Sequence, residues 1–516
     1  MARKFNVLQI GGIDRSPNFE HKAKTVWHYV SETDVQQGAD AVTAQLPHKV
    51  KFDFIYVQMA YSDTLIALLS MASQPYTTYI DQAYWNDRFE NDPNVQRYMM
   101  RPFVYADEQE REEKLQAVTF PGQYGDKISP AYCIVQHDFQ GATHYEGNNA
   151  FVIKGDFGAT MAPLLSWQRS LVYDKDKVIQ VWPEYTLTGG IEVEFVYRLV
   201  PFDQPGQVTE VFVRQHHELT TPLEIPRRSY DAHIVMSMRA KGAGTIRIGA
   251  VHKRWSRLDM GQFILGGKRY ADSHRNEFIY YFNPGDMKPP LNVYFSGYRS
   301  AEGFEGYFMM NQLKAPFMLI GDPRVEGGSF YLGSDEYEQA LKQVILDSLD
   351  YLGFQRNDLI LSGLSMGSFG ALYYGAQLNP AAVVVGKPLV SIGTVAENMA
   401  LVRPEDFGTS LDVLRKNEGD LTSVAIERLN QKFWKVFEQA DSSKTTFALS
   451  YMIHDDYDPH AFEMLLPILS RQHARVMQRG VPGRHNDDSP TITSWFINFY
   501  NMILEQQFGR GRKHAK

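Results

Sequence analysis

The segment Gly363-Leu364-Ser365-Met366-Gly367 places a serine between two glycines, each two residues away. It follows Asp358–Ser362, an apolar run typical of a buried strand, and precedes Ser368–Ala376, which has the pattern of a helix. A sharp strand-to-helix turn strains the backbone at the serine and lifts its hydroxyl clear of the sheet, and flanking glycines leave room for that turn. The pattern predicts Ser365 to be a catalytic nucleophile.

A serine hydroxyl is a weak nucleophile at neutral pH, so it needs a histidine base that is usually oriented by a carboxylate. After a nucleophile of this kind, the acid and then the histidine follow along the chain. His485 fits best, because it comes directly after the last expected strand and before a final helix that Ser489 can cap. His454, His460 and His473 are the alternatives.

Three aspartates follow the expected strand Phe447–Ile453, namely Asp455, Asp456 and Asp458. Asp455 is closest to the position that the acid usually occupies after such a strand, and Asp456 is the main alternative. Aspartates before a proline also form turns and cap helices well. We therefore predict Asp455 to be the acid and assign the others to the turn.

An oxyanion requires two backbone N–H donors, one from the residue after the nucleophile and one from the loop after an earlier strand. Met366 supplies the first donor. The second is predicted to be the amide of Gly297 or Tyr298, in the glycine-containing loop after the expected strand Leu291–Phe295. Arg299, in the same loop, is a candidate either to contact a substrate anion or to pair with a carboxylate.

The elements that must position these residues divide the chain into four parts. Residues 1–125 show strand-like runs with helical patterning between them, which indicates a small α/β unit. Residues 126–285 show short alternating segments with turns, which favour an antiparallel β-sandwich. Strand–helix alternation over residues 286–508 predicts an α/β domain with a mostly parallel sheet and helices on both faces. Residues 509–516 form a basic tail.

The middle part is rich in aromatic residues, including Trp167, Trp182 and Trp255. Pyranose rings pack on aromatic side chains, so exposed tryptophans would give a carbohydrate-binding face. Tryptophans are, however, more often part of the core. For any one of the three we favour a core position.

Composition narrows the class of protein. The 516 residues carry a net charge of −8 and a single cysteine, Cys133. This charge gives no reason to expect a nucleic-acid partner, and one cysteine cannot form an internal disulfide. No apolar run reaches the roughly 18 residues that a membrane span requires, and no export signal is visible. We expect a soluble, cytoplasmic protein with at most peripheral membrane association.

With Ser365, the Asp455 loop and His485 placed, the carboxyl-terminal half resembles the α/β-hydrolase superfamily. The whole chain resembles the second accessory Sec system proteins of streptococci and staphylococci. The segments that carry this resemblance are Asn292–Arg299, Gly363–Gly370, Val385–Leu389 and Gly483–Asn486.

The resemblance implies a cytosolic protein that works beside two other accessory Sec proteins and the accessory Sec ATPase, with the inner face of the membrane as the place where it would meet the translocase. Together they export a serine-rich repeat glycoprotein adhesin. It also implies a serine-dependent O-acetyltransferase acting on N-acetylglucosamine residues of that adhesin, with Ser365, Asp455 and His485 as the triad. It points to no bound cofactor or metal and leaves the acetyl donor open. A non-catalytic scaffold or chaperone of the export complex, or a carbohydrate esterase, is the alternative.

Overall fold

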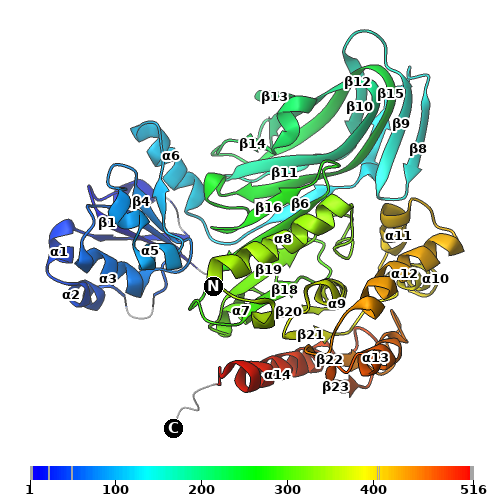
Figure 1. Ribbon diagram of the computed structural model, residues 1–516. Coiled ribbons are helices and arrows are strands. Elements are labelled where there is room, and N and C mark those ends of the chain that lie inside the picture. Colours follow the sequence, from blue (N-terminus) through cyan, green and yellow to red (C-terminus); the bar gives the residue numbers. More distant parts are fainter. Residues whose placement is uncertain are drawn as a thin grey trace.

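Three β-sheets follow one another along the chain in a computed structural model, which describes residues 4–20, 22, 24–47, 50–403, 405 and 407–511 (Figure 1). Residues 512–516 of the predicted basic tail lie outside the described residues. Arg510, predicted to belong to that tail, is instead held in place, because its Nη2 lies 2.8 Å from Asp286 Oδ1. No helix among the described residues is long and apolar enough to cross a membrane.

The first sheet has five parallel strands in the order β2-β1-β3-β4-β5. Helices connect most of its strands, as the predicted α/β unit requires. The elements are β1 (Phe5–Gly11), β2 (Thr25–Val30), α1 (Glu32–Gln36), α2 (Ala39–Gln45), β3 (Phe54–Gln58), α3 (Asp63–Ala72), β4 (Thr78–Asp81), α4 (Asp87–Glu90), α5 (Pro93–Arg97), β5 (Arg101–Phe103) and α6 (Glu108–Val118).

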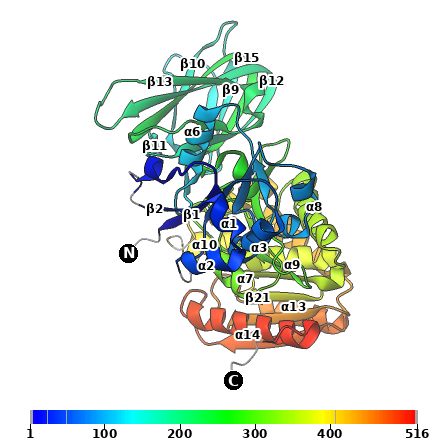
Figure 2. The same ribbon diagram turned by 90° about the vertical axis from the view of Figure 1, so that its left-hand side faces the viewer.

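This unit packs against the rest of the chain through buried aromatic and charged side chains. The ring of Tyr76 lies 5.7 Å from that of Tyr281, centroid to centroid. The buried Arg257 guanidinium donates to the carbonyl oxygens of Phe120 and Gly122 at 3.0 and 2.8 Å. Figure 2 shows the unit with the second sheet above it and the C-terminal helix at the bottom.

The second sheet is antiparallel, as predicted, but its ten strands form one hydrogen-bonded network instead of the two separate sheets of a sandwich. The reason is that two very long strands, β12 and β15, pair along their whole length. The strands are β6 (Gly125–Ile128), β7 (Cys133–Val135), β8 (Ala142–Glu146), β9 (Ala150–Asp156), β10 (Ala162–Trp167), β11 (Leu171–Tyr173), β12 (Val178–Pro201), β13 (Glu210–Gln215), β14 (Leu223–Ile225) and β15 (Ala232–Ser256).

Glycines in the middle of the two long strands allow them to bend together. Gly189 in β12 and Gly242 in β15 have φ of +101° and +89°, a region that favours glycine. A Cβ atom at Gly242 would lie 1.9 Å from the carbonyl oxygen of Gly190. The sheet therefore curves around its own core at a place where no side chain fits (Figure 1).

The tryptophans of this part do not form an exposed platform. Trp167 and Trp182 are buried, and Trp255 is half-buried. The Arg275 guanidinium lies 3.7 Å from the ring centroid of Trp182. Burial of Trp167 and Trp182 confirms the core assignment for these two and removes them as a sugar-stacking face, whereas Trp255 is covered only in part.

The third sheet has eight strands in the order β16-β17-β19-β18-β20-β21-β22-β23. Pairing is parallel from β19 to β23, whereas β16 and β17 are antiparallel at one edge. The strands are β16 (Lys268–Ala271), β17 (Glu277–Asn283), β18 (Leu291–Phe295), β19 (Phe317–Gly321), β20 (Leu359–Leu364), β21 (Ala382–Gly386), β22 (Thr446–Met452) and β23 (Arg475–Val481).

This sheet begins earlier in the chain than expected. Residues 268–283 form β16 and β17, although the sequence pattern placed everything up to residue 285 with the middle part. Period-two alternation is the same in either sheet, so it could not assign these two strands. The boundary between the second and third sheets therefore lies between Ser256 and Lys268.

Helices cover both faces of the third sheet. Alternate residues of β20 show this, because Leu361 packs in the core that includes α8 and α9 whereas Ile360 packs in the core that includes α14. The helices are α7 (Tyr307–Gln312), α8 (Asp335–Leu352), α9 (Met366–Leu378), α10 (Ile392–Val402), α11 (Ser410–Glu418), α12 (Ser423–Gln439), α13 (Ala461–Arg471) and α14 (Ser489–Phe508). β20 is thus a central strand, buried on both sides.

A buried cluster of charges joins the second sheet to the third. His252 and Arg254 of β15 contact Glu302, in the loop after β18, and Arg254 also contacts Glu277 of β17. His252 Nε2 lies 3.0 Å from Glu184 of β12. Burial alone would lower the pKa of His252, but the carboxylates of Glu302 and Glu184 outweigh it and raise this pKa above 6.5.

We expect the destabilisation caused by His252→Gln to depend on pH. A histidine whose pKa rises on folding contributes stability that is fully present below its unfolded-state pKa, near 6.5, and is lost as pH rises through the folded-state pKa. The substitution should lower the free energy of unfolding by about 3–5 kcal/mol at low pH, because it leaves buried carboxylates without their partner. The cost should shrink at alkaline pH.

Urea midpoints of wild type and variant, measured at about pH 6 and pH 9, check this expectation. His137→Gln is the matched control, since His137 is exposed. A cost of His252→Gln that is equal or larger at pH 9 would show that His252 is not stabilised as an imidazolium.

Candidate active site

Ser365 lies at the turn between β20 and α9, as the sequence pattern predicts. Its backbone has φ 53° and ψ −121°, a strained combination for a residue with a side chain. Its N–H donates to the carbonyl oxygen of Gly386 in β21 at 2.8 Å. The hydroxyl therefore projects from the carboxyl edge of the sheet, at the start of a helix.

The two glycines of the turn are required by close backbone contacts. A Cβ at Gly363 would lie 2.2 Å from the carbonyl oxygen of Gly367, and a Cβ at Gly367 would lie 2.1 Å from the carbonyl oxygen of Phe295. Both distances are far below van der Waals contact. The turn can therefore form only with glycine at these two positions.

The structure brings Ser365, His485 and Asp455 together. Ser365 Oγ lies 2.9 Å from His485 Nε2, and His485 Nδ1 lies 2.8 Å from Asp455 Oδ2. His485 is 1% exposed, and its ring stacks on that of Tyr457 at 4.1 Å between centroids. This order of contacts allows His485 to take the serine proton while the carboxylate fixes the tautomer of the imidazole.

Asp455, Asp456 and Asp458, the three aspartates in the loop after β22, have different contacts. Asp455 accepts the Tyr457 N–H at 2.9 Å with one oxygen and faces His485 with the other. Asp456 accepts the backbone N–H of His485 at 3.0 Å and pairs with Arg403. Asp458 accepts two backbone amides, and burial raises its pKa. Only Asp455 contacts the imidazole, whereas Asp456 holds the backbone of the histidine loop.

The predicted oxyanion donors border the same cavity. Met366 is the first residue of α9, so its N–H has no acceptor within the helix. The Gly297 N–H already donates to Glu305 Oε2, at 2.7 Å. Within the described part of the chain, the Tyr298 N–H has no such acceptor. Of the two amides that the sequence left open, Tyr298 is thus the one that remains available.

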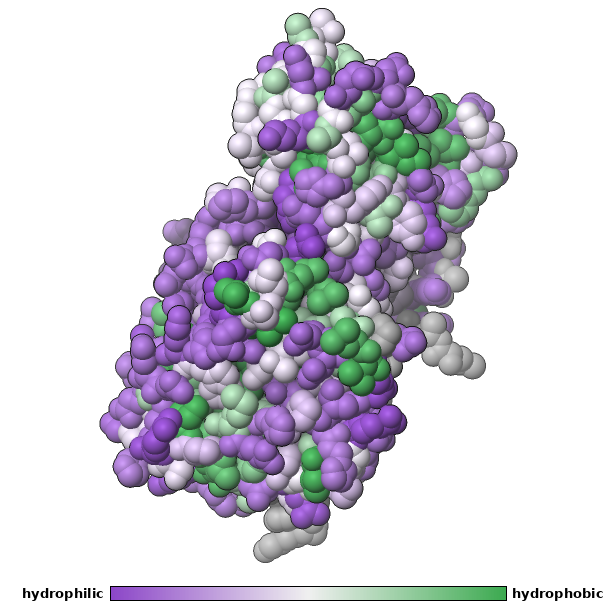
Figure 3. All heavy atoms as spheres, turned by 90° about the vertical axis from the view of Figure 1, so that its right-hand side faces the viewer, coloured by the Kyte–Doolittle hydropathy of each residue, from purple (hydrophilic) through white to green (hydrophobic). Residues whose placement is uncertain are grey.

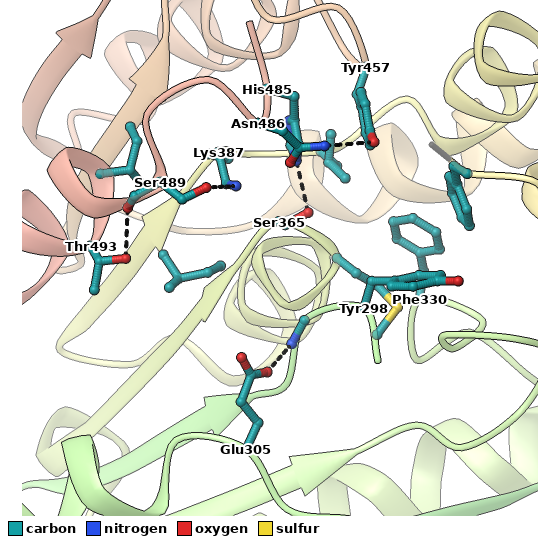
Figure 4. Close-up of a pocket in the computed structure, with 16 residues that line it drawn as sticks. Tyr298, Glu305, Phe330, Ser365, Lys387, Tyr457, His485, Asn486, Ser489 and Thr493 are labelled. Carbon is teal, nitrogen blue, oxygen red and sulfur yellow. Dashed lines mark hydrogen bonds between the residues drawn. The ribbon is translucent and has the colours of Figure 1, made fainter. Parts of the chain in front are cut away.

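A cavity of about 330 Å³ opens above the serine. Figure 4 shows Ser365 at its centre, with Lys387, Ser489 and Thr493 on one side and Tyr298 and Phe330 on the other. The lining residues are Gly297, Tyr298, Glu305, Phe330, Leu364, Ser365, Met366, Lys387, Leu389, Phe407, Tyr457, His485, Asn486, Ser489, Ile492 and Thr493. A small acyl group and part of a second substrate fit this volume.

Sequence reasoning missed most of the lining residues, among them Lys387, Tyr457 and Glu305. Lys387 lies in a segment that carried the family resemblance, which was a signal that could have found it. Tyr457 lies within the aspartate-rich loop, where a tyrosine beside three aspartates carries no signal of its own. Glu305 had no sequence signal, because its place beside Gly297 arises only from the folded loop. His454, His460 and His473, the alternative bases, are not among the residues that line the cavity.

One group of side chains among the described residues could offer metal ligands, namely His252, Glu277 and Glu302. The Arg254 guanidinium already donates to both carboxylates. A metal ion would have to displace this cation from a fully buried position. The cluster is therefore better suited to joining the two sheets than to binding a metal.

The fold and the site define a protein in which a mostly parallel sheet holds a strained serine in contact with a buried histidine, and that histidine in contact with an aspartate. This is the arrangement that nucleophilic serine chemistry requires. The chain belongs to the accessory Sec system GspB-transporter family, whose family model matches residues 5–510. This confirms the family that the sequence motifs indicated.

Relatives cover the chain almost completely. An accessory Sec system protein of Staphylococcus aureus (strain NCTC 8325 / PS 47) is 57% identical over 99% of this chain and 98% of its own length. One of Streptococcus gordonii is 37% identical over 99% and 100%. A chain of the solved glycosylation-associated protein (Gap123) complex of Streptococcus agalactiae is 35% identical, covers 99% of both chains and has a TM-score of 0.89.

We expect Asp455→Asn to lower kcat/KM for hydrolysis of a neutral acetyl ester by roughly 10³- to 10⁴-fold, because the amide favours the wrong imidazole tautomer. Asp456→Asn is the matched variant in the same loop. It should cost no more than about tenfold, since Asp456 contacts a backbone N–H and not the ring. Steady-state kinetics on both variants, with folding checked by circular dichroism, test the assignment. A larger loss for Asp456→Asn would exchange the two roles.

Proposed function

We propose that this protein is a serine-dependent O-acetyltransferase that modifies sugar residues of a glycoprotein adhesin handled by the accessory Sec system. The observation that carries the proposal is the contact chain from Ser365 through His485 to Asp455, which ends in a cavity. Membership of the accessory Sec family supports the choice of a glycoprotein adhesin as substrate. The strand order of the third sheet, with the nucleophile after its fifth strand, supports an α/β-hydrolase type of enzyme.

In the first half of the proposed reaction, Ser365 Oγ attacks the acetyl carbonyl of the donor while His485 Nε2 accepts the serine proton. The negative charge that develops on the carbonyl oxygen is stabilised by the N–H groups of Met366 and Tyr298. The bond between the acetyl group and the donor then breaks, and the leaving atom takes the proton from His485. An acetyl ester on Ser365 remains.

In the second half, a sugar hydroxyl attacks the acetyl ester as His485 accepts its proton. Collapse of the intermediate breaks the bond to Ser365 Oγ, and His485 returns the proton to that oxygen. Water could attack in the same way, so transfer requires an acceptor that fills the cavity. The ring of Tyr298, which is 45% exposed, offers an apolar surface of the kind on which a pyranose packs (Figure 4).

A second role as a scaffold of the export machinery is compatible with this chemistry. The first two sheets lie outside the part that carries Ser365, and a relative was solved within a complex of Gap proteins. On the face that carries α10 to α12, apolar patches interrupt the polar surface (Figure 3). Leu401, Val402 and Val424 there are 77%, 68% and 61% exposed, as is common at protein–protein interfaces.

Ser365→Ala should abolish acetylation of the adhesin glycans, because no other group can form the acyl-enzyme. Mass spectrometry of glycans from cells that carry the variant measures the loss, and an export assay of the same cells measures the scaffold role separately. Ser443→Ala, at an exposed serine, is the matched control. Unchanged acetylation in the Ser365 variant would rule out the enzymatic proposal; lost acetylation with normal export would separate the two roles.

A further inference from the structure

Lys387 follows β21 and borders the cavity beside the candidate nucleophile. Its φ of 53° lies in the left-handed region, which is unfavourable for a residue with a Cβ. Its N–H donates to the carbonyl oxygen of Ser450 at 2.8 Å, and its carbonyl oxygen accepts the Ser368 hydroxyl at 3.3 Å. Strand β22, through Ser450, and helix α9, through Ser368, thus hold Lys387 in a strained conformation. The side chain of Lys387 is long and positively charged.

The charge of Lys387 is buried without a carboxylate partner. The residue is 8% exposed, and its Nζ donates to Ser489 Oγ at 3.0 Å. Among the described residues, no carboxylate lies within ion-pair distance of it. By contrast, the buried Arg324 pairs with Asp322 and the buried Lys253 pairs with Asp174.

A buried cation without a counter-ion is costly, so it is expected where a ligand supplies the missing charge. Burial lowers the pKa of Lys387 below its usual value, and the negative charge of Asp455 opposes this effect. Within the part of the chain that the structure describes, the Lys387 ammonium therefore lacks a negatively charged partner at ion-pair distance, and it belongs to a residue that lines the cavity.

The cavity is asymmetric around Ser365. Lys387 lies on the side that also carries the Ser489 and Thr493 hydroxyls, whereas the other side is aromatic (Figure 4). The faces of aromatic rings carry partial negative charge, so they repel an anion and accept the apolar face of a sugar. Glu305 is the single carboxylate among the lining residues, and its charge also directs an anion toward Lys387.

We propose that Lys387, together with the Ser489 hydroxyl, binds an anionic group, a phosphate or a carboxylate, carried by the acetyl donor. This inference rests on the proposed acetyl transfer. The anionic fragment leaves with the donor's leaving atom once that atom has taken the proton from His485. The neutral acetyl ester on Ser365 then faces a neutral sugar from the aromatic side, so donor and acceptor use different sides of the cavity.

The test compares donors that differ in charge. Lys387→Met should lower kcat/KM for acetyl phosphate, acetyl-coenzyme A or 4-acetoxybenzoate by roughly 10- to 100-fold, mainly through a higher KM, because a hydrogen bond between charged groups is lost. The same variant should hydrolyse the neutral ester 4-nitrophenyl acetate within about twofold of wild type. The two phosphate-bearing donors and the carboxylate-bearing one distinguish the two kinds of anion.

Two further variants complete the test: one is a control for the loss of a positive charge, and the other alters the same contact while keeping Lys387. Lys435→Met removes an equal charge from the exposed face of α12 and should leave the ratio of anionic to neutral donor use unchanged. Ser489→Ala removes the hydroxyl that holds the ammonium and should weaken anionic donors alone, by less than Lys387→Met. It is usable even where Lys387→Met fails to fold, because Asp488, and not Ser489, caps α14.

Equal losses for neutral and anionic donors in both cavity variants would overturn the inference, because they would indicate a structural role of Lys387. A wild-type enzyme that accepts none of the anionic donors would also overturn it. Either result leaves the proposed function intact if sugars are still acetylated. If wild type hydrolyses the neutral ester but acetylates no sugar from any donor, the proposed transferase function itself fails.

Discussion

The close approach of backbone to backbone around Ser365 is the constraint on which the site depends. Gly367 lies against the end of β18, Gly363 lies against Gly367, and the Ser365 N–H is bonded to the end of β21. Three adjacent strands and the first turn of α9 therefore meet at one residue. A strained serine persists only where its surroundings determine its conformation from several sides, and here two glycines make such contact possible. Because the loop after β18 carries Tyr298, the proposed second oxyanion donor, the same contact places Ser365 relative to that amide.

The second sheet contributes to the site through the loop that follows β18. Glu302 in this loop is bound by His252 and Arg254 of β15, and its N–H donates to the carbonyl oxygen of Gly125 at 2.9 Å. Glu305, three residues further on, accepts the Gly297 N–H. The loop is thus attached at one end to the sheet of the nucleophile and at the other to a different sheet. A rigid attachment of this kind keeps backbone donors oriented before the reaction begins, which is what oxyanion stabilisation requires.

The sequence was sufficient for features encoded locally. Apolar β20, the glycines around Ser365 and the order of the acid and histidine loops all follow from short patterns, and the structure has Ser365 in contact with His485. Features that depend on tertiary packing were not accessible. The alternation of β16 and β17 does not say which sheet they join, and only loop geometry decides that Asp455 and not Asp456 meets the imidazole. The place of Glu305 and Lys387 in the cavity wall also depends on segments distant in sequence.

Burial of the base bears directly on the choice between transfer and hydrolysis in the proposed mechanism. His485 is almost completely buried, and the ring of Tyr457 covers one face of its imidazole. A nucleophile can therefore reach Nε2 only through the cavity that also holds the acetyl ester. A sugar that occupies the cavity excludes water from the one position where the base can activate it. In the proposed mechanism, hydrolysis then competes only when the acceptor is absent, so the proposed selectivity for transfer follows from the shape of the cavity and needs no change in the triad.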